Sequence, residues 1–129
     1  HISIHCNLTK ETHHLVNAKR LSMMPGKKSG IECGNHIVNC ARGGIIDEDA
    51  LLDALEMGVI TSAALDVFEI EPLPANYKLV QHENFHGTPH IGAATLEAQH
   101  RVGLDIAEAV NVALKGKKPK TLVNSEYLS

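Results

Sequence analysis

Short apolar runs and amphipathic segments alternate along the chain, and this alternation predicts strands and helices in turn. Apolar residues that alternate with polar ones, or follow one another directly, predict strands at residues 2–6, 36–40, 59–68 and 84–88. Apolar residues spaced three and four positions apart predict helices at residues 18–24, 48–57 and 95–114. Strands that alternate with helices are typical of an α/β fold with a parallel sheet.

Residues that begin and end helices support these boundaries. Asp47 and Thr95 can cap the second and third helices, because their side-chain oxygens can accept from open backbone amides. Gly58 and Gly116 suit the ends of the same two helices. The apolar face of the third helix comprises Val102, Ile106, Ala109, Val110 and Ala113. The segment 59–68 is almost continuously apolar, which favours a strand buried on both faces of the sheet.

Composition narrows the class of protein. The chain has 129 residues, room for one compact domain, and only 3% are aromatic, so aliphatic residues and alanine build the core. A net charge of −3 argues against generic nucleic-acid or membrane-surface binding. No apolar run approaches the ~20 residues that a membrane-spanning helix needs. Three cysteines and no leader-like segment near His1 favour reduced thiols and a cytoplasmic setting.

Polar clusters follow three of the predicted strands, at the points where the strands end. They are Arg42, then Asp66 with Glu69 and Glu71, then His90. Because ligands of open parallel sheets bind beyond the carboxyl ends of the strands, we expect these clusters to converge. Arginine matches a carboxylate with a planar fork, and histidine exchanges protons near neutral pH. A carboxylate bonded to the histidine would orient it and favour its protonated form. Together the clusters predict a site for a small carboxylic acid.

Each residue also has a structural interpretation. Arg42 alone could form a surface ion pair, Glu69 and Glu71 could be solvated loop charges, and His90 could be a structural residue after Pro89. Spacing by itself leaves these alternatives open.

Longer motifs surround the same residues. They are Asn39–Gly44 followed by Asp47 and Glu48, Ala64–Pro72, and Thr88–Ala93. Glu71 lies 29 residues after Arg42, and His90 lies 19 residues after Glu71. In content and spacing the chain resembles the D-isomer-specific 2-hydroxyacid dehydrogenases, and the resemblance covers nearly its whole length.

The resemblance implies an oxidoreductase that transfers hydride between NAD and the 2-hydroxy or 2-oxo group of a small acid. In the implied catalytic set, Arg42 holds the substrate carboxylate, His90 exchanges the hydroxyl proton, and Glu71 hydrogen-bonds His90. Asp66 would accept from the nicotinamide carboxamide. The implied NAD-lining residues are Cys6, Cys40, Ala41, Asp66, His90, Gly92 and Ala93. No metal is implied.

The Gly-rich phosphate loop of dinucleotide-binding folds does not occur in this sequence. In the family, that loop precedes the matched region. The chain therefore resembles the C-terminal half of a Rossmann-type, doubly wound NAD-binding domain over residues 1–118, with a return segment toward the substrate domain at 119–129. We expect this chain alone not to turn over substrate, and the complete enzyme to be a homodimer.

Within the family, the segment from His90 to Gln99 is similar to the 3-phosphoglycerate dehydrogenase branch, which implies serine biosynthesis. Glyoxylate/hydroxypyruvate reductases share much of these motifs. Non-catalytic, NAD-binding corepressors share the Arg–Glu–His set. Both remain alternatives.

One segment departs from the family pattern. About seven residues near 27–33 are extra, and a loop insertion and a sequencing or gene-prediction artefact are equally open explanations. Cys33, His36 and Cys40 have the spacing of zinc ligands, with His5 or Cys6 as a fourth, but Cys33 is expected in a loop and the other two in a strand. We expect the other histidines at the surface or in loops, including His13 and His14.

Overall fold

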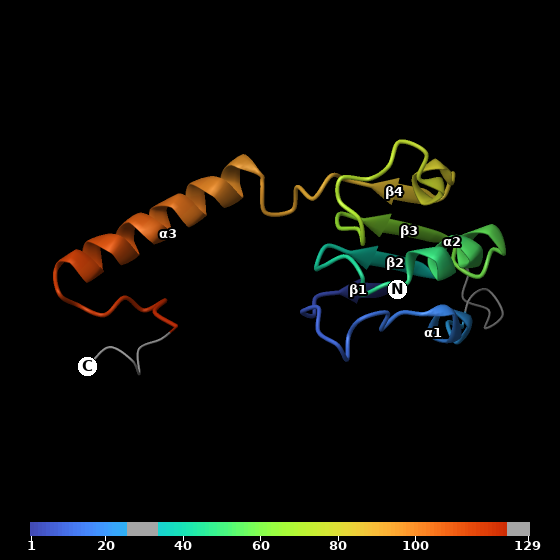
Figure 1. The fold of residues 1–129 in the computed structure, drawn as a ribbon, viewed down its shortest axis with the longest axis horizontal. Helices are drawn as coiled ribbons and strands as arrows, with labels where there is room; N and C mark the ends of the chain where they lie inside the picture. Colours follow the sequence, from blue (N-terminus) through green and yellow to red (C-terminus); the bar gives the residue numbers. More distant parts are fainter. Residues whose placement is uncertain (26–33, 124–129) are drawn as a thin grey trace. The chain divides into compact units, whose positions relative to one another are not determined.

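The computed structural model describes residues 1–25 and 34–123. Four strands, β1 (Ile2–Ile4), β2 (His36–Asn39), β3 (Ser62–Leu65) and β4 (Phe85–Gly87), form one parallel sheet in the order β1-β2-β3-β4. Figure 1 shows all four arrows pointing the same way. The helices are α1 (Ala18–Ser22), α2 (Glu48–Glu56), the 3₁₀ helix η2 (Lys78–Gln81) and α3 (Leu96–Leu114). The predicted α/β fold is confirmed.

Residues 1–92 and 93–129 form two compact units. The first contains the sheet with α1, α2 and η2, and the second contains α3. The predicted extent of the NAD-binding half, residues 1–118, remains a prediction for the complete protein.

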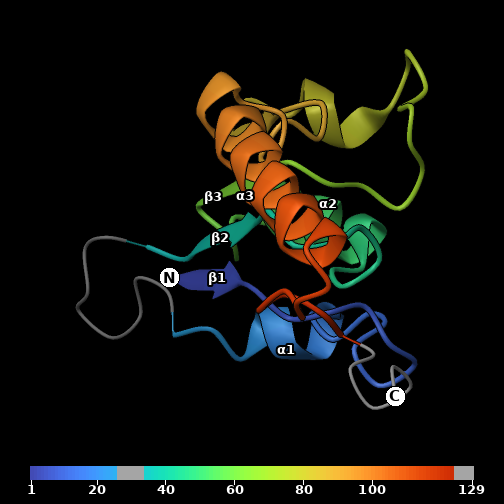
Figure 2. The same cartoon turned by 90° about the vertical axis from the view of Figure 1, so that its left-hand side faces the viewer.

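The sheet of the first unit has one covered face. In register, Ile37, Ala63 and Phe85 lie side by side on this face and are buried. Helices α1 and α2 contact each other and lie on the same side of the sheet (Figure 2). This placement is expected from chirality, because strand–helix–strand connections of parallel sheets are almost always right-handed and the strands here progress in one direction.

The opposite face differs from the sequence prediction. Val38 is 40% exposed there, and its neighbour Ala64 is half-buried. The prediction of a strand at 59–68 buried on both faces is therefore wrong. The strand is only Ser62–Leu65, and Ile60 and Val67 are buried within the loops that flank it. The continuous apolar run at 59–68 thus consists of a short strand and the buried loop residues on either side of it.

The predicted helix boundaries agree with the structure. Asp47 Oδ1 accepts from the Ala50 amide at 3.0 Å, and Thr95 Oγ1 accepts from the Ala98 amide at 3.2 Å. Gly58 has a φ of 68° after the last turn of α2. Helix η2 was not predicted, because Pro72 and Pro74 shortly before it favour a loop. Its Leu79 is 2% exposed and packs into the core, so tertiary burial stabilises this turn.

Helix α3 of the second unit carries exposed apolar side chains. Val102, Ile106 and Val110, on the face predicted from their spacing, are all more than half exposed in α3. Within the described residues, no helix is both long and apolar enough to cross a bilayer.

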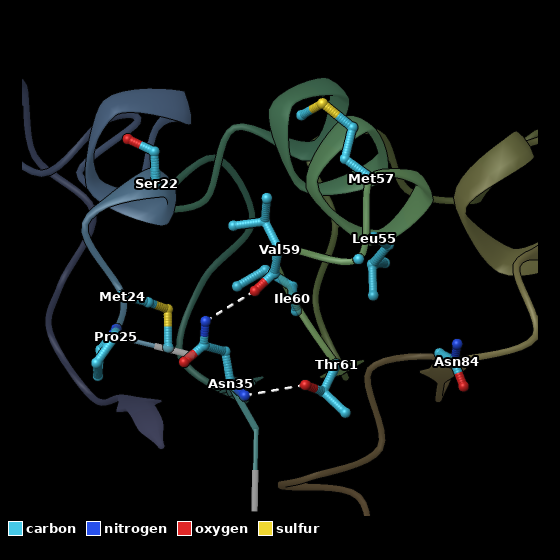
Figure 3. A pocket seen from close by; sticks show the side chains of 11 residues that line it. Ser22, Met24, Pro25, Asn35, Leu55, Met57, Val59, Ile60, Thr61 and Asn84 are labelled. Carbon is cyan, nitrogen blue, oxygen red and sulfur yellow. Dashed lines mark hydrogen bonds between the residues drawn. The ribbon is translucent and has the colours of Figure 1, made fainter. Parts of the chain in front are cut away.

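A pocket of about 730 Å³ lies at the amino ends of the strands. Asn35, Thr61 and Asn84, which precede β2, β3 and β4, are among its lining residues (Figure 3). The Asn35 side-chain amide donates to Val59 O at 2.7 Å, and the Asn35 backbone amide donates to Thr61 Oγ1 at 3.0 Å. This pocket is at the sheet edge opposite to the predicted chemistry.

The packing of α2 predicts a large stability difference between two leucine substitutions. Leu51 is 0% exposed, so Leu51→Ala should lower the free energy of unfolding by about 2–5 kcal/mol. Leu114 is 84% exposed, so Leu114→Ala should change it by less than about 0.5 kcal/mol. Urea denaturation of the two variants checks this, and equal effects would contradict the assignment of the core.

Candidate functional site

The loops that follow the four strands carry the predicted site residues. Cys6 follows β1, Arg42 follows β2, Asp66 directly follows β3, and His90 follows β4. All these loops leave the same edge of the sheet, because the strands are parallel (Figure 1). The predicted convergence is thus present in the backbone, and the side-chain contacts show which residues meet.

Glu71 and His90 form a hydrogen-bonded pair. Glu71 Oε2 lies 2.8 Å from His90 Nδ1, and Glu71 Oε1 accepts from the Phe68 amide at 2.9 Å. The bond to His90 and the Phe68 amide lower the pKa of the Glu71 carboxyl, despite some desolvation. An ionised carboxylate only accepts hydrogen bonds, so His90 Nδ1 carries the proton in this pair. His90 Nε2 then remains able to exchange a proton with a ligand.

Asp66 holds the turn that carries His90. Its carboxylate is buried and accepts from Thr88 Oγ1 at 2.5 Å, from the Ile91 amide at 2.9 Å and from the Gly92 amide at 2.8 Å. Burial raises the pKa of Asp66, but these three donors outweigh burial and the net pKa is lowered. Asp66 is therefore ionised at neutral pH and binds the turn through charge-assisted hydrogen bonds.

The backbone of His90 is strained. Its φ of 56° lies in the left-handed region, which costs a residue other than glycine about 1–3 kcal/mol. The Asp66 bonds to the next two amides keep the turn in this conformation. Strain of this kind concentrates at functional positions, so it supports the site assignment.

Arg42 lies at the same edge but is not joined to the pair. Its guanidinium is exposed, and Nη1 donates to Ala41 O at 2.6 Å. In the part of the chain that is described, it makes no hydrogen bond to Glu71 or His90. Its backbone is fixed by Asn39, which is 1% exposed, accepts from the Ala41 amide and donates to Arg42 O, both at 2.9 Å. Sequence reasoning missed Asn39, although a polar residue ending a buried strand was a usable signal.

Gly43 brings the Arg42 loop directly onto the turn that leads to Glu71. A Cβ at Gly43 would lie 1.9 Å from Phe68 O and 2.8 Å from the Glu69 amide nitrogen. Only a residue without a side chain permits this approach. The loops after β2 and β3 are therefore in backbone contact.

His14 was expected at the surface, and this expectation is wrong in part. His14 is half-buried, and its Nε2 lies 2.9 Å from Glu69 Oε1. Its backbone has a φ of 48°, and its amide donates to Gly44 O at 2.8 Å. The loop after β1 thus contacts the loops after β2 and β3. No sequence signal indicated this pairing, because 55 residues separate His14 from Glu69.

The other predicted cofactor residues have small side chains. Cys6 and Ala41 are half-buried, Cys40 is exposed, and both thiols are free. A Cβ at Gly92 would lie 2.9 Å from Asp66 Oδ2, so this position also requires a minimal side chain. Ala93 is exposed and begins the second unit.

The zinc alternative involves Cys33, which lies outside the described residues. His36 Nδ1 lies 2.7 Å from Ser62 Oγ, in the sheet. Among residues 1–25 and 34–123, no cluster of three histidine, cysteine or acidic side chains could hold a metal ion.

A hollow of about 430 Å³ adjoins the Glu71–His90 pair. It is lined mainly by apolar residues, which are Phe68, Pro72, Leu73 and Pro89 together with the pair itself. A ligand in this hollow would contact both an apolar wall and an ionisable pair.

The approach of Gly43 to Phe68 predicts a severe effect of one methyl group. Gly43→Ala should separate the two loops and lower the free energy of unfolding by more than about 2 kcal/mol. Gly103→Ala is the matched control: a Cβ there meets no atom within 4 Å, and alanine is the better helix former. Chemical denaturation compares them, and a neutral Gly43→Ala would contradict the described contact.

The lowered pKa of Glu71 predicts a pH dependence. The unfolded carboxyl, near its ordinary value of 4.5, protonates before the folded one, so the contribution of Glu71 is present above that pH and is lost as the pH falls toward the folded pKa. Urea denaturation of the wild type and of Glu71→Gln should show a stability difference above pH 4.5 that shrinks as the solution is acidified below this value. A difference that grows on acidification would contradict the pair.

Comparison with known proteins agrees with these observations. Residues 1–92 match the family described as D-isomer specific 2-hydroxyacid dehydrogenase, NAD binding domain. The chain is 48% identical over 124 residues to D-3-phosphoglycerate dehydrogenase 3, chloroplastic, of Arabidopsis thaliana, covering 96% of this chain and 20% of that protein. It is 46% identical over 127 residues to the glyoxylate reductase of Thermofilum pendens, covering 98% and 35%.

Solved structures show the same fold. The NAD-complexed D-isomer specific 2-hydroxyacid dehydrogenase of Lactobacillus delbrueckii ssp. bulgaricus aligns with a TM-score of 0.78 and 30% identity, over 95% of this chain and 39% of that one. The enzyme of Xanthobacter autotrophicus Py2 in complex with NADPH and MES aligns with a TM-score of 0.69 and 34% identity, over 96% and 48%. The chain thus spans less than half the length of each of these four proteins. It belongs to the NAD-binding domain family of the D-isomer-specific 2-hydroxyacid dehydrogenases.

Proposed function

We propose that this chain supplies the proton-transferring and carboxylate-binding groups of an NAD-dependent D-2-hydroxyacid dehydrogenase. The observation that carries the proposal is the 2.8 Å contact between Glu71 Oε2 and His90 Nδ1 at the carboxyl edge of a parallel sheet. Family membership supports the reaction class.

In the proposed mechanism, Glu71 positions His90 and His90 moves the proton. Glu71 accepts from Nδ1 and fixes the ring, so that Nε2 faces the exchangeable proton of the substrate. His90 accepts the proton of the 2-hydroxyl during oxidation and returns it to the 2-oxo oxygen during reduction. The carboxylate of Glu71 stabilises the imidazolium that exists while His90 holds this proton.

Arg42 is the proposed carboxylate-binding residue. Its guanidinium is exposed, and among the described residues it has several N–H donors beyond the bond to Ala41 O. It can thus bind the substrate carboxylate through two parallel hydrogen bonds. The same fork would polarise the neighbouring 2-oxo oxygen and orient the reacting carbon.

The residues at this edge fit one half of NAD. Cys6, Cys40 and Ala41 are small and uncharged, as a flat ring in close contact requires, and Asp66 Oδ2 keeps a lone pair beyond its bond to Gly92. These residues, with Gly92 and Ala93, are proposed to hold the nicotinamide side. The cofactor supplies hydride transfer when it is bound. The pyrophosphate side needs a Gly-rich loop that this sequence does not contain.

The proposed substrate is 3-phosphoglycerate, on the basis of the His90–Gln99 segment. The Arabidopsis relative, named a D-3-phosphoglycerate dehydrogenase, and the Thermofilum relative, named a glyoxylate reductase, are almost equally similar to this chain. Glyoxylate or hydroxypyruvate is therefore the second candidate. Comparing kcat/KM for hydroxypyruvate 3-phosphate, hydroxypyruvate and glyoxylate in the complete enzyme distinguishes the two.

Substitution of the two catalytic residues tests the proposal. In the complete enzyme, His90→Ala should lower kcat/KM by about 10²–10⁴-fold, because the proton no longer has a positioned acceptor. Arg42→Ala should raise KM and lower kcat, because it removes the fork that binds and orients the carboxylate. The matched controls are His100→Ala and Arg101→Ala, two exposed residues of α3. Activity retained within about tenfold in both site variants would contradict the proposed roles.

A further inference from the structure

Glu48 is a buried acid that the proposed chemistry does not use. It is the first residue of α2 and is 4% exposed. Desolvation raises the pKa of its carboxyl, although hydrogen bonds from Tyr77 and from the Glu69 amide oppose this. No lysine, arginine or histidine forms an ion pair with it among the described residues. A buried carboxylate without a cationic partner costs stability, so its presence calls for another explanation.

The two carboxylate oxygens of Glu48 bind two separate parts of the chain. Oε1 accepts from the Glu69 amide at 2.7 Å, and Oε2 accepts from the Tyr77 hydroxyl in a very short contact. Burial and the neighbouring Glu48 raise the pKa of Tyr77, so its hydroxyl stays a proton donor. Helix α2 is thereby attached to both ends of the segment from Phe68 to Tyr77.

The first of these contacts lies next to the reactive pair. The Glu69 amide follows Phe68, whose own amide donates to Glu71 Oε1, and the other oxygen of Glu71 contacts His90. Gly43 packs on the same peptide unit, the one between Phe68 and Glu69. The start of α2 and the Arg42 loop therefore hold the Phe68–Glu69 peptide, which directly follows the Phe68 amide that orients Glu71.

We propose that Glu48 is a positioning residue, whose carboxylate holds the turn from Phe68 to Glu71 so that Glu71 Oε2 stays on His90 Nδ1. The inference rests on the proposed function for its catalytic consequence, but the positioning itself is a property of the fold. Among the described residues, the Glu48 carboxylate bonds the Glu69 amide and the Tyr77 hydroxyl and does not line the hollow, so it acts through the turn.

The titration of the Glu71 carboxyl tests this positioning directly, by ¹³C NMR on the 129-residue chain. In the wild type Glu71 titrates below its ordinary value of 4.5. In Glu48→Leu combined with Tyr77→Phe, which removes the buried charge and its hydroxyl partner together, the Glu71 pKa should rise toward 4.5. Glu48→Gln, which keeps one carbonyl acceptor for the Glu69 amide, should give a smaller rise.

Glu56→Gln is the matched control, because Glu56 is an exposed acid at the other end of the same helix. It removes an equal charge and should leave the Glu71 titration unchanged. An unshifted Glu71 in folded Glu48 variants would overturn the proposal. Loss of folding in both Glu48→Gln and the double variant would also overturn it, because Glu48 would then be required for the fold itself.

A kinetic measurement separates this inference from the proposed function. In the complete enzyme, Glu48→Gln should lower kcat about ten- to hundredfold, with little change in the KM for NAD, because it misplaces Glu71 and His90 without touching the cofactor. Equal losses in kcat and in cofactor affinity would overturn the positioning role. If His90→Ala proved active while Glu71 still responded to Glu48, the function would fail and the positioning would stand.

Discussion

The buried carboxylate of Asp66 is the interaction on which the site depends. Asp66 directly follows β3 and accepts from Thr88, Ile91 and Gly92, so the residue after one strand fixes the turn that follows the next strand. These bonds to the Ile91 and Gly92 amides hold the turn in which His90 has a φ of 56°. The position of His90 therefore depends on an ionised acid kept out of water, which is stable only because each of its donors is in place.

Glu71, the partner of His90, is also held by contacts to the turn that carries it. Glu48 binds the Glu69 amide, Gly43 lets a neighbouring loop reach Phe68, and His14 contacts the side chain of Glu69. These contacts come from the first residue of α2, the loop after β2 and the loop after β1. A parallel sheet makes this possible because it places the ends of sequence-distant strands side by side. The fold thus brings Glu71 and His90, 19 residues apart in sequence, to 2.8 Å.

Much of this arrangement could be predicted from sequence, since strand periodicity and the polar residues after each strand indicated the edge where Arg42, Asp66, Glu71 and His90 occur. Helix caps such as Asp47 were equally predictable, because the amide that a cap binds lies only three residues further along the chain. Asn39, His14 and Glu48 escaped prediction because their partners are set by tertiary packing. The length of the strand at 59–68 was overestimated for a related reason. Ile60 and Val67 are apolar because they are buried in loops, and the sequence does not distinguish them from buried strand residues.

The tautomer of His90 tests the central claim, that Glu71 fixes the ring and leaves Nε2 for the substrate. ¹⁵N NMR of the imidazole nitrogens in the wild-type protein, recorded with the ring neutral, distinguishes the two tautomers. The account predicts a proton on Nδ1, because an ionised Glu71 can only accept, and a non-protonated Nε2. A proton on Nε2 with a bare Nδ1 would contradict it.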